Sequence, residues 1–238
     1  AAGFVQGLSG FGFSLVAMSI WAWTIDPQLA AVMAVFGGLT GQVMAAFTLK
    51  RQPDWKRLLP FVFGGLLGLP LGLLLLPRLD VQMFKLFIGL LLVLWCPAML
   101  FSNRLPRLTH GGRLADGTAG LAGGIMGALG GFSGVIPTLW CTLRGYEKSE
   151  QRSIIQNFNL AALAATMLSY VAAGLVTRDT LPMLGIVAPA MLLPAWLGGK
   201  LYTGISDVAF RRVVLGLLTC SGIALLASAL PALLRRIA

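Results

Sequence analysis

The sequence predicts an all-α integral membrane protein built from two homologous halves. Of its 238 residues, 57% are hydrophobic and 11% are charged, and the mean hydropathy is +0.85. A soluble domain carries about 25% charged residues. The charges are also grouped, which leaves long uncharged runs, and features of the first part of the chain recur in the second. Composition therefore points to lipid as the solvent, and the recurrence points to a duplication.

Eight uncharged runs follow one another along the chain. They cover about 1–25, 27–49, 58–77, 86–103, 117–143, 153–177, 180–199 and 213–234. Since roughly 20 apolar residues cross a bilayer as a helix, eight hydrophobic segments are predicted. The chain opens without Met inside an apolar stretch. We therefore expect that part of the first segment is missing, with a cleaved signal peptide as the alternative.

The recurrence keeps its order along the chain, as a duplication requires. Gly3, Gly7 and Gly10 recur as Gly120, Gly124 and Gly127; Phe13-Ser14 recurs as Phe132-Ser133; and Asp80-Val81 recurs as Asp207-Val208. The predicted organisation is a first repeat of four segments at 1–105, a polar linker at 106–112 and a second repeat of four segments at 113–238.

The distribution of basic residues bears on the topology. If all eight segments cross the membrane, the 18 Lys and Arg residues divide 10 to 8 between its two sides. If the glycine-rich opening segment of each half enters and leaves on one side, they divide 13 to 5, which restores a positive cytoplasmic side. Three crossings and one re-entrant segment per half make the halves inverted repeats, a recurring plan of secondary transporters. Eight simple crossings in parallel halves is the alternative.

The two glycine-rich tracts are the most informative stretches. Each Gly inside a helix costs close to 1 kcal/mol relative to Ala, yet residues 120–134 contain seven. One explanation is close helix packing through small residues. The other is a break in the helix, where N–H groups at a helix amino terminus attract an anion. Because the tract occurs twice, each time with a Ser beside its last glycines, the sequence favours the break.

Candidate substrate-binding residues are mostly neutral, because every basic residue lies near a segment end. Buried amides must face protein or a water-filled cavity, whereas a single hydroxyl often bonds its own helix. Arg152 is expected either to draw anions to the mouth of the path or to anchor the topology. The candidates are Gln6, Ser9, Gly10, Gly12, Ser14, Gln42, Gly130, Gly131, Ser133, Gly134, Thr138, Arg152, Gln156, Asn157 and Asn159.

Several other classes of function find no support in the sequence. The basic residues lie in short connectors and form no stripe for nucleic acid. Cys96, Cys141 and Cys220 lie in separate apolar segments, and His110 is alone in the linker, so no metal site is expected. No hydrolase or nucleotide motif is present, so neither an enzyme nor a cofactor is expected. All acidic residues, Asp116 among them, are expected in connectors, which offers no buried proton carrier.

The opening residues 3–18 (GFVQGLSGFGFSLVAM), the second tract ending at 130–137 (GGFSGVIP) and the following Leu143-Arg144-Gly145-Tyr146 resemble the TauE/SafE family of sulfite and organosulfonate transporters. The resemblance covers nearly the whole chain. It implies a multi-pass permease of the bacterial inner membrane that moves sulfite, sulfoacetate or related sulfonates. Relatives often carry Pro where this chain has Ser19 and Ile136, so the particular anion is left open.

We therefore expect a secondary transporter for small anions that works by alternating access. Its expected partners are membrane lipid and a small anionic substrate, and a homodimer is left open. One alternative is a membrane-embedded assembly or scaffold protein without a translocation path. Another is a permease for an uncharged or cationic solute. Transport direction and coupling ion are not specified by the sequence.

Overall fold

The computed structural model describes residues 1–9, 12–48, 54–102, 107–108, 111–201 and 207–237. These residues form helices and no strand, which confirms the predicted all-α class. The elements are α1 (Ala2–Ser9), α2 (Phe13–Trp21), α3 (Pro27–Thr48), α4 (Trp55–Leu75), the short 3-10 helix η1 (Leu76–Arg78), α5 (Val81–Leu100), α6 (Gly112–Gly130), α7 (Val135–Leu143), α8 (Lys148–Ala172), α9 (Leu181–Leu201) and α10 (Asp207–Ile237).

Six helices of the described chain are long and apolar enough to cross a membrane. Their spans are Pro27–Phe47, Trp55–Arg78, Val81–Leu100, Lys148–Ala172, Leu181–Gly198 and Arg212–Leu234. The other two predicted segments, at 1–25 and 117–143, are each divided between two helices. The chain is thus a multi-pass membrane protein with six candidate spans and two interrupted glycine-rich segments.

Aspartates at the membrane edges start the long helices. Asp54 accepts a hydrogen bond from the Lys56 N–H (3.0 Å) at the start of α4, and Asp80 accepts one from the Met83 N–H (2.8 Å) at the start of α5. Such caps satisfy N–H groups that have no partner within the helix.

Asp116 is an exception to the prediction that acidic residues lie in connectors. It lies inside α6, only 4% exposed, because the Trp140 indole donates to its Oδ1 (2.7 Å).

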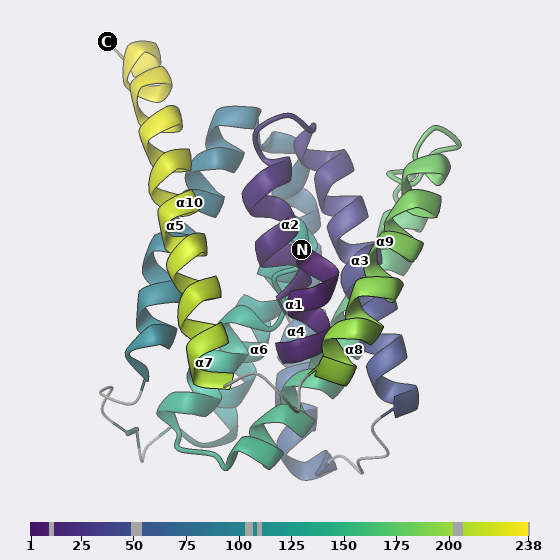
Figure 1. Ribbon diagram of the computed structural model, residues 1–238, viewed down its shortest axis with the longest axis vertical. Helices are drawn as coiled ribbons and strands as arrows, with labels where there is room; N and C mark the ends of the chain where they lie inside the picture. Colours follow the sequence, from purple (N-terminus) through teal and green to yellow (C-terminus); the bar gives the residue numbers. More distant parts are fainter. Residues whose placement is uncertain (10–11, 49–53, 103–106, 109–110, 202–206, 238) are drawn as a thin grey trace.

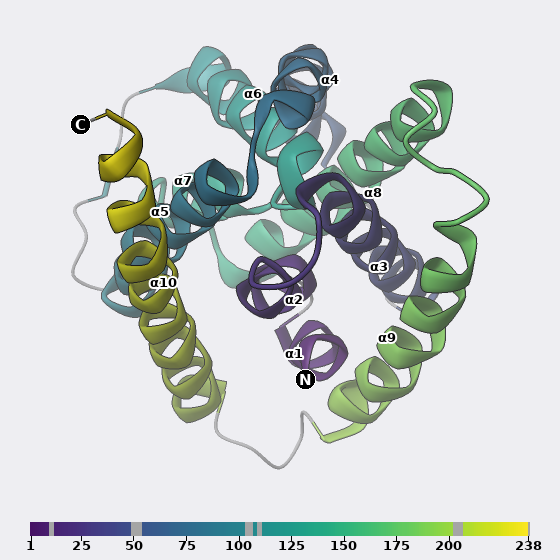
Figure 2. The same cartoon turned by 90° about the horizontal axis from the view of Figure 1, so that it is seen from above.

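Helices of the two predicted halves interleave. Gly3 and Gly7 place α1 against Met191 and Ala195 of α9, and the two helices run in the same direction. Likewise α6 runs parallel to α4, with Gly120 against Phe61 and Gly124 against Gly65. Figure 2 shows α6 beside α4 and α10 beside α5. The first helix of each opening segment therefore packs on the helix of the third predicted segment of the opposite half.

Basic residues gather at one end of the molecule. In Figure 1, α4, α6, α8 and α10 begin at the lower end, whereas α3, α5 and α9 begin at the upper end. Basic side chains stand near the starts of α4, α6, α8 and α10 and beside the end of α7. We call this the basic end, formed among the described residues by Lys56, Arg57, Arg107, Arg113, Arg144, Lys148, Arg152 and Arg212.

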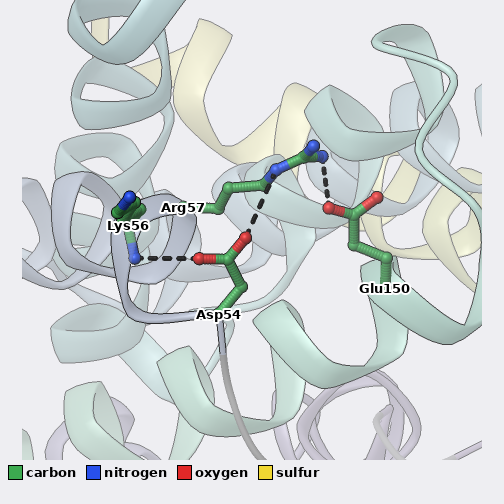
Figure 3. Close-up of polar contacts among 4 residues, drawn as sticks. All are labelled: Asp54, Lys56, Arg57 and Glu150. Atoms are coloured by element: carbon green, nitrogen blue, oxygen red, sulfur yellow. Dashed lines mark hydrogen bonds and ion pairs between the residues drawn. The ribbon is translucent and has the colours of Figure 1, made fainter.

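Arg57 ties α4 to α8 at the basic end. Figure 3 shows its guanidinium between Asp54, 3.6 Å away, and Glu150 of α8, with which it forms a close ion pair. The same guanidinium lies over the Tyr146 ring, 5.2 Å from its centroid. Because the Arg57 side chain is 46% exposed, water screens these charges, and the ion pairs stabilise the fold only weakly.

Candidate functional site

Each glycine-rich tract is broken by one glycine in the left-handed region of the Ramachandran plot. Gly12, before α2, has φ 103°, and Gly131, after α6, has φ 75°. A side chain is strained in this conformation, so glycine is the residue that allows the chain to end one helix and start another. The predicted breaks are therefore present in both tracts, one between α1 and α2 and the other between α6 and α7.

Other glycines of the tracts serve packing instead. An added Cβ at Gly3 would approach the Met191 carbonyl oxygen within 2.6 Å, and one at Gly124 would overlap the backbone of Gly65. Small residues at such positions let membrane helices approach backbone to backbone. Both explanations of the glycine content therefore apply. Glycines within the helices allow close packing, and the glycines at the turns break the helix.

The two breaks meet. Ser14, in the first turn of α2, places its hydroxyl against Gly131, where an added Cβ would lie 2.5 Å from Ser14 Oγ. Gly38 of α3 faces the same hydroxyl, with an added Cβ 3.5 Å from it. Residues more than 100 positions apart in the sequence thus come into direct contact at the point where both helices are interrupted.

A cavity of about 30 Å³ lies between the breaks. A site holds one water once this volume reaches roughly 10–15 Å³, so the cavity has room for a few waters or one small ion. Eight predicted site residues line it, namely Gln6, Gly12, Ser14, Gln42, Gly131, Ser133, Gly134 and Asn159. Phe13, Leu15, Gly38, Phe132, Val135 and Leu163 complete the lining and were not predicted.

Neighbouring helices hold the second break in place. The Trp95 indole of α5 donates to the Val135 carbonyl (2.8 Å), at the first residue of α7. The Tyr170 hydroxyl of α8 donates to the Ala128 carbonyl (2.6 Å), one of the last carbonyls of α6. The bond to Ala128 satisfies a carbonyl that the end of α6 leaves without a partner, and the bond to Val135 ties the start of α7 to α5.

Two of the three side-chain amides that line the cavity, those of Gln6 and Asn159, use their oxygens within the protein. Gln6 Oε1 accepts from the Phe13 N–H (3.1 Å), and Asn159 Oδ1 accepts from the Ser133 hydroxyl (2.9 Å). The remaining polar group of each amide is its NH₂, which only donates. Asn159 Nδ2 lies at the Gly134 backbone, 2.7 Å from where a Cβ would stand. Asn159 therefore offers a donor to the cavity.

Backbone N–H groups add further donors. Neither Gly12 nor Gly134, the residues before α2 and α7, can supply a side-chain cap. Within the described chain, the N–H groups of Ser14, Leu15, Ser133 and Gly134 have no hydrogen-bond acceptor. All four residues line the cavity. Because α2 and α7 both start here, the positive ends of two helix dipoles also converge on it.

The lining carries no charged side chain in the part of the chain that the structure describes. Donors and helix amino termini without a carboxylate give a cavity of positive potential. Such a cavity suits a small anion, which accepts hydrogen bonds on every side. It suits a cation poorly, because the amino termini of α2 and α7 repel positive charge.

Other predicted site residues lie away from the cavity. Gly130 ends α6 and packs on Phe132 and Met18. Asn157 donates to the Ser153 carbonyl (2.8 Å), so its side chain bonds its own helix and does not line the cavity. Thr138, Arg152 and Gln156 lie toward the basic end from the lining. Ser9 ends α1, but its side chain is outside the description, and Gly10 lies outside the described residues.

The fold and the site together define a multi-pass membrane protein with a donor-lined cavity between two broken helices. A comparison with protein families matches residues 1–225 to the family described as sulfite exporter TauE/SafE, and the chain belongs to that family. This membership makes the protein a membrane transporter of sulfur anions. Comparison with curated proteins and with solved structures found no match.

Proposed function

We propose that this chain is a secondary transporter that binds a small sulfur-containing anion in the cavity between its two breaks. The observation that carries the proposal is the polarity of the lining. Asn159 turns its oxygen to a protein donor, and four backbone N–H groups of the lining have no acceptor among the described residues. An anion completes all of these hydrogen bonds at once, and hydrogen bonds to a charged group are the stronger kind.

The size of the cavity favours sulfite within this class of substrates. Its volume of about 30 Å³ matches an anion of a few atoms. Sulfoacetate carries an additional carboxylate arm, and its binding requires the two breaks to move apart. We therefore propose that sulfite is the preferred substrate over sulfoacetate and related organosulfonates.

Alternating access is the proposed mode of transport. The halves act as inverted repeats, a proposal supported by the way α1 packs on α9 and α6 on α4. Each break would then belong to one of two symmetry-related bodies, with the cavity between them. Relative movement of these bodies would open the cavity to one side and then to the other. The proposed location is the bacterial inner membrane, with the basic end in the cytoplasm.

Uptake into proteoliposomes tests this function. Purified protein should carry sulfite faster than sulfoacetate, whereas acetate should compete weakly with both. Empty liposomes and liposomes with an unrelated membrane protein give the background. If none of the three anions is transported or bound, the proposal is wrong, and a scaffold without a translocation path becomes the better interpretation.

A further inference from the structure

Four buried polar atoms lie between the cavity and the basic end and have no hydrogen-bond partner in the described chain. They are Thr138 Oγ1 of α7 and Arg152 Nε, Ser153 Oγ and Gln156 Nε2 of α8. An unpaired polar atom buried away from water costs about 1–3 kcal/mol. Helix packing alone gives no reason to keep four of them in one region.

Two of these residues share one face of α8 with the cavity. Arg152, Gln156 and Asn159 follow a spacing of four and three residues, which aligns side chains along one side of a helix. Asn159 and Leu163, the next member of the stripe, line the cavity. At 1.5 Å per residue, Arg152 stands about 10 Å from Asn159 along the helix axis.

Thr138 approaches the same region from α7. It lies one turn after Gly134, a lining residue, and is only 3% exposed. Its carbonyl accepts from Gln151 Nε2 (3.2 Å), which joins α7 to α8 at this level. Gln151 also donates to Thr142 Oγ1 (3.0 Å), so Gln151 and Thr142 are satisfied. The hydroxyl of Thr138 is left without a partner.

The charge of Arg152 is not neutralised by its neighbours. Glu150, two residues earlier, forms its close ion pair with Arg57 instead (Figure 3). No ion pair to Arg152 is formed within the described chain. A half-buried guanidinium with a buried Nε and no carboxylate partner attracts an anion more strongly than an exposed basic residue does.

We propose that Arg152, Gln156 and Thr138 form a second anion-binding station between the cavity and the basic end. It rests on the proposed function, since it takes the same small oxyanion that the cavity takes. An anion that enters from or leaves to the basic end is held here before or after it occupies the cavity. The station is therefore used on one side of the membrane only.

Sulfite uptake from each side of the membrane tests the station. Everted vesicles present the basic end to the medium, and right-side-out vesicles present the opposite end. Arg152→Gln is expected to raise the KM for sulfite about tenfold in everted vesicles, which corresponds to about 1.4 kcal/mol. Its KM in right-side-out vesicles should stay within about twofold of the wild type. Arg152→Lys, which keeps the charge, should recover most of the loss.

Lys148→Gln is the matched control, because Lys148 precedes Arg152 by one turn on the same stripe and is exposed. It should leave both KM values unchanged. Thermal unfolding of each purified variant, with and without sulfite, shows whether it folds and whether its cavity still binds. Gln156→Ala should also raise the KM for sulfite in everted vesicles only. This variant tests the station independently if the Arg152 variant does not fold.

The two proposals fail in different ways. If wild-type protein neither transports sulfite in either kind of vesicle nor gains stability from it, both are wrong. If wild-type protein transports sulfite but Arg152→Gln and Gln156→Ala change both sides equally, or neither side, the station is overturned while the transport proposal stands.

Discussion

The Ser14 hydroxyl lies against the backbone of Gly131, so that one broken helix closes directly on the other. A Cβ at Gly131 would come within 2.5 Å of Ser14 Oγ and within 3.3 Å of the Ala34 backbone. Contact between the two breaks brings the amino termini of α2 and α7 to one cavity. Donors from both halves are therefore available to a single bound anion.

Gly131→Ala should destabilise the protein and abolish sulfite transport. Alanine is strained at φ 75° and its Cβ meets Ser14 Oγ, which together cost about 1–3 kcal/mol. The midpoint of thermal unfolding and the rate of uptake measure the two effects. Gly185→Ala in α9 is the control, since nothing lies within 4 Å of the added Cβ. If Gly131→Ala and Gly185→Ala have the same unfolding midpoint and the same rate of uptake, the turn at Gly131 does not have this role.

Asn159→Asp should remove anion binding with little change in shape. The retained oxygen still accepts from Ser133, but the donor Nδ2 becomes a carboxylate oxygen that repels the anion. We expect sulfite affinity to fall at least about tenfold, as for loss of a hydrogen bond to a charged group. Asn157→Asp, which changes an amide bonded to its own helix, is the control. Unchanged affinity in Asn159→Asp would exclude Asn159 from the binding site.

Cysteines at Ser14 and Ser133 should react with a membrane-impermeant thiol reagent, and sulfite should slow the reaction. Both residues line the cavity, which a transporter must open to water. The background is Cys220→Ser, because Cys220 is exposed whereas Cys96 and Cys141 are buried. Mass spectrometry gives the labelled fraction over time. No labelling at either position, in protein that folds, would favour a scaffold without a translocation path.

Arg57→Ala should lower stability by about 1 kcal/mol or less and leave the KM for sulfite unchanged from both sides. Arg57 joins Asp54 and Glu150 at the edge of the fold, where solvent screens the ion pairs. The midpoint of thermal unfolding at low and high salt measures the change, which should shrink as salt rises. A large loss of transport would mean that this contact takes part in the movement of the helices.

Much of the fold could be predicted from the sequence because lipid imposes simple rules. Long uncharged runs gave the six spanning helices, and the repeated glycine tracts gave both interruptions. The pairing of α1 with α9 and of α6 with α4 was not predicted. It depends on backbone contacts at Gly7 and Gly124, whose partners lie in the other half and leave no local pattern.

The candidate site could be predicted only where the glycine turns determine it. Gln6, Ser14, Ser133 and Asn159 reach the cavity, whereas Arg152, Gln156 and Asn157 do not. The rotation of α8 about its own axis decides which of its amides faces the cavity. The positions of polar residues in the sequence do not determine that rotation. Asp116 was placed in a connector because no pattern in the sequence pairs it with Trp140, 24 residues away.

The central claim is that the cavity between the breaks holds a small anion, and thermal unfolding of the purified wild-type protein tests it most directly. Sulfite, as a sodium salt at fixed ionic strength and without oxygen, should raise the unfolding midpoint in a saturable manner. A ligand at 100 times its Kd stabilises the folded state by about 2.7 kcal/mol. Sodium chloride and a neutral solute of similar size should have no such effect. If a neutral or cationic solute stabilises the protein and sulfite does not, the cavity does not bind anions and the account is wrong.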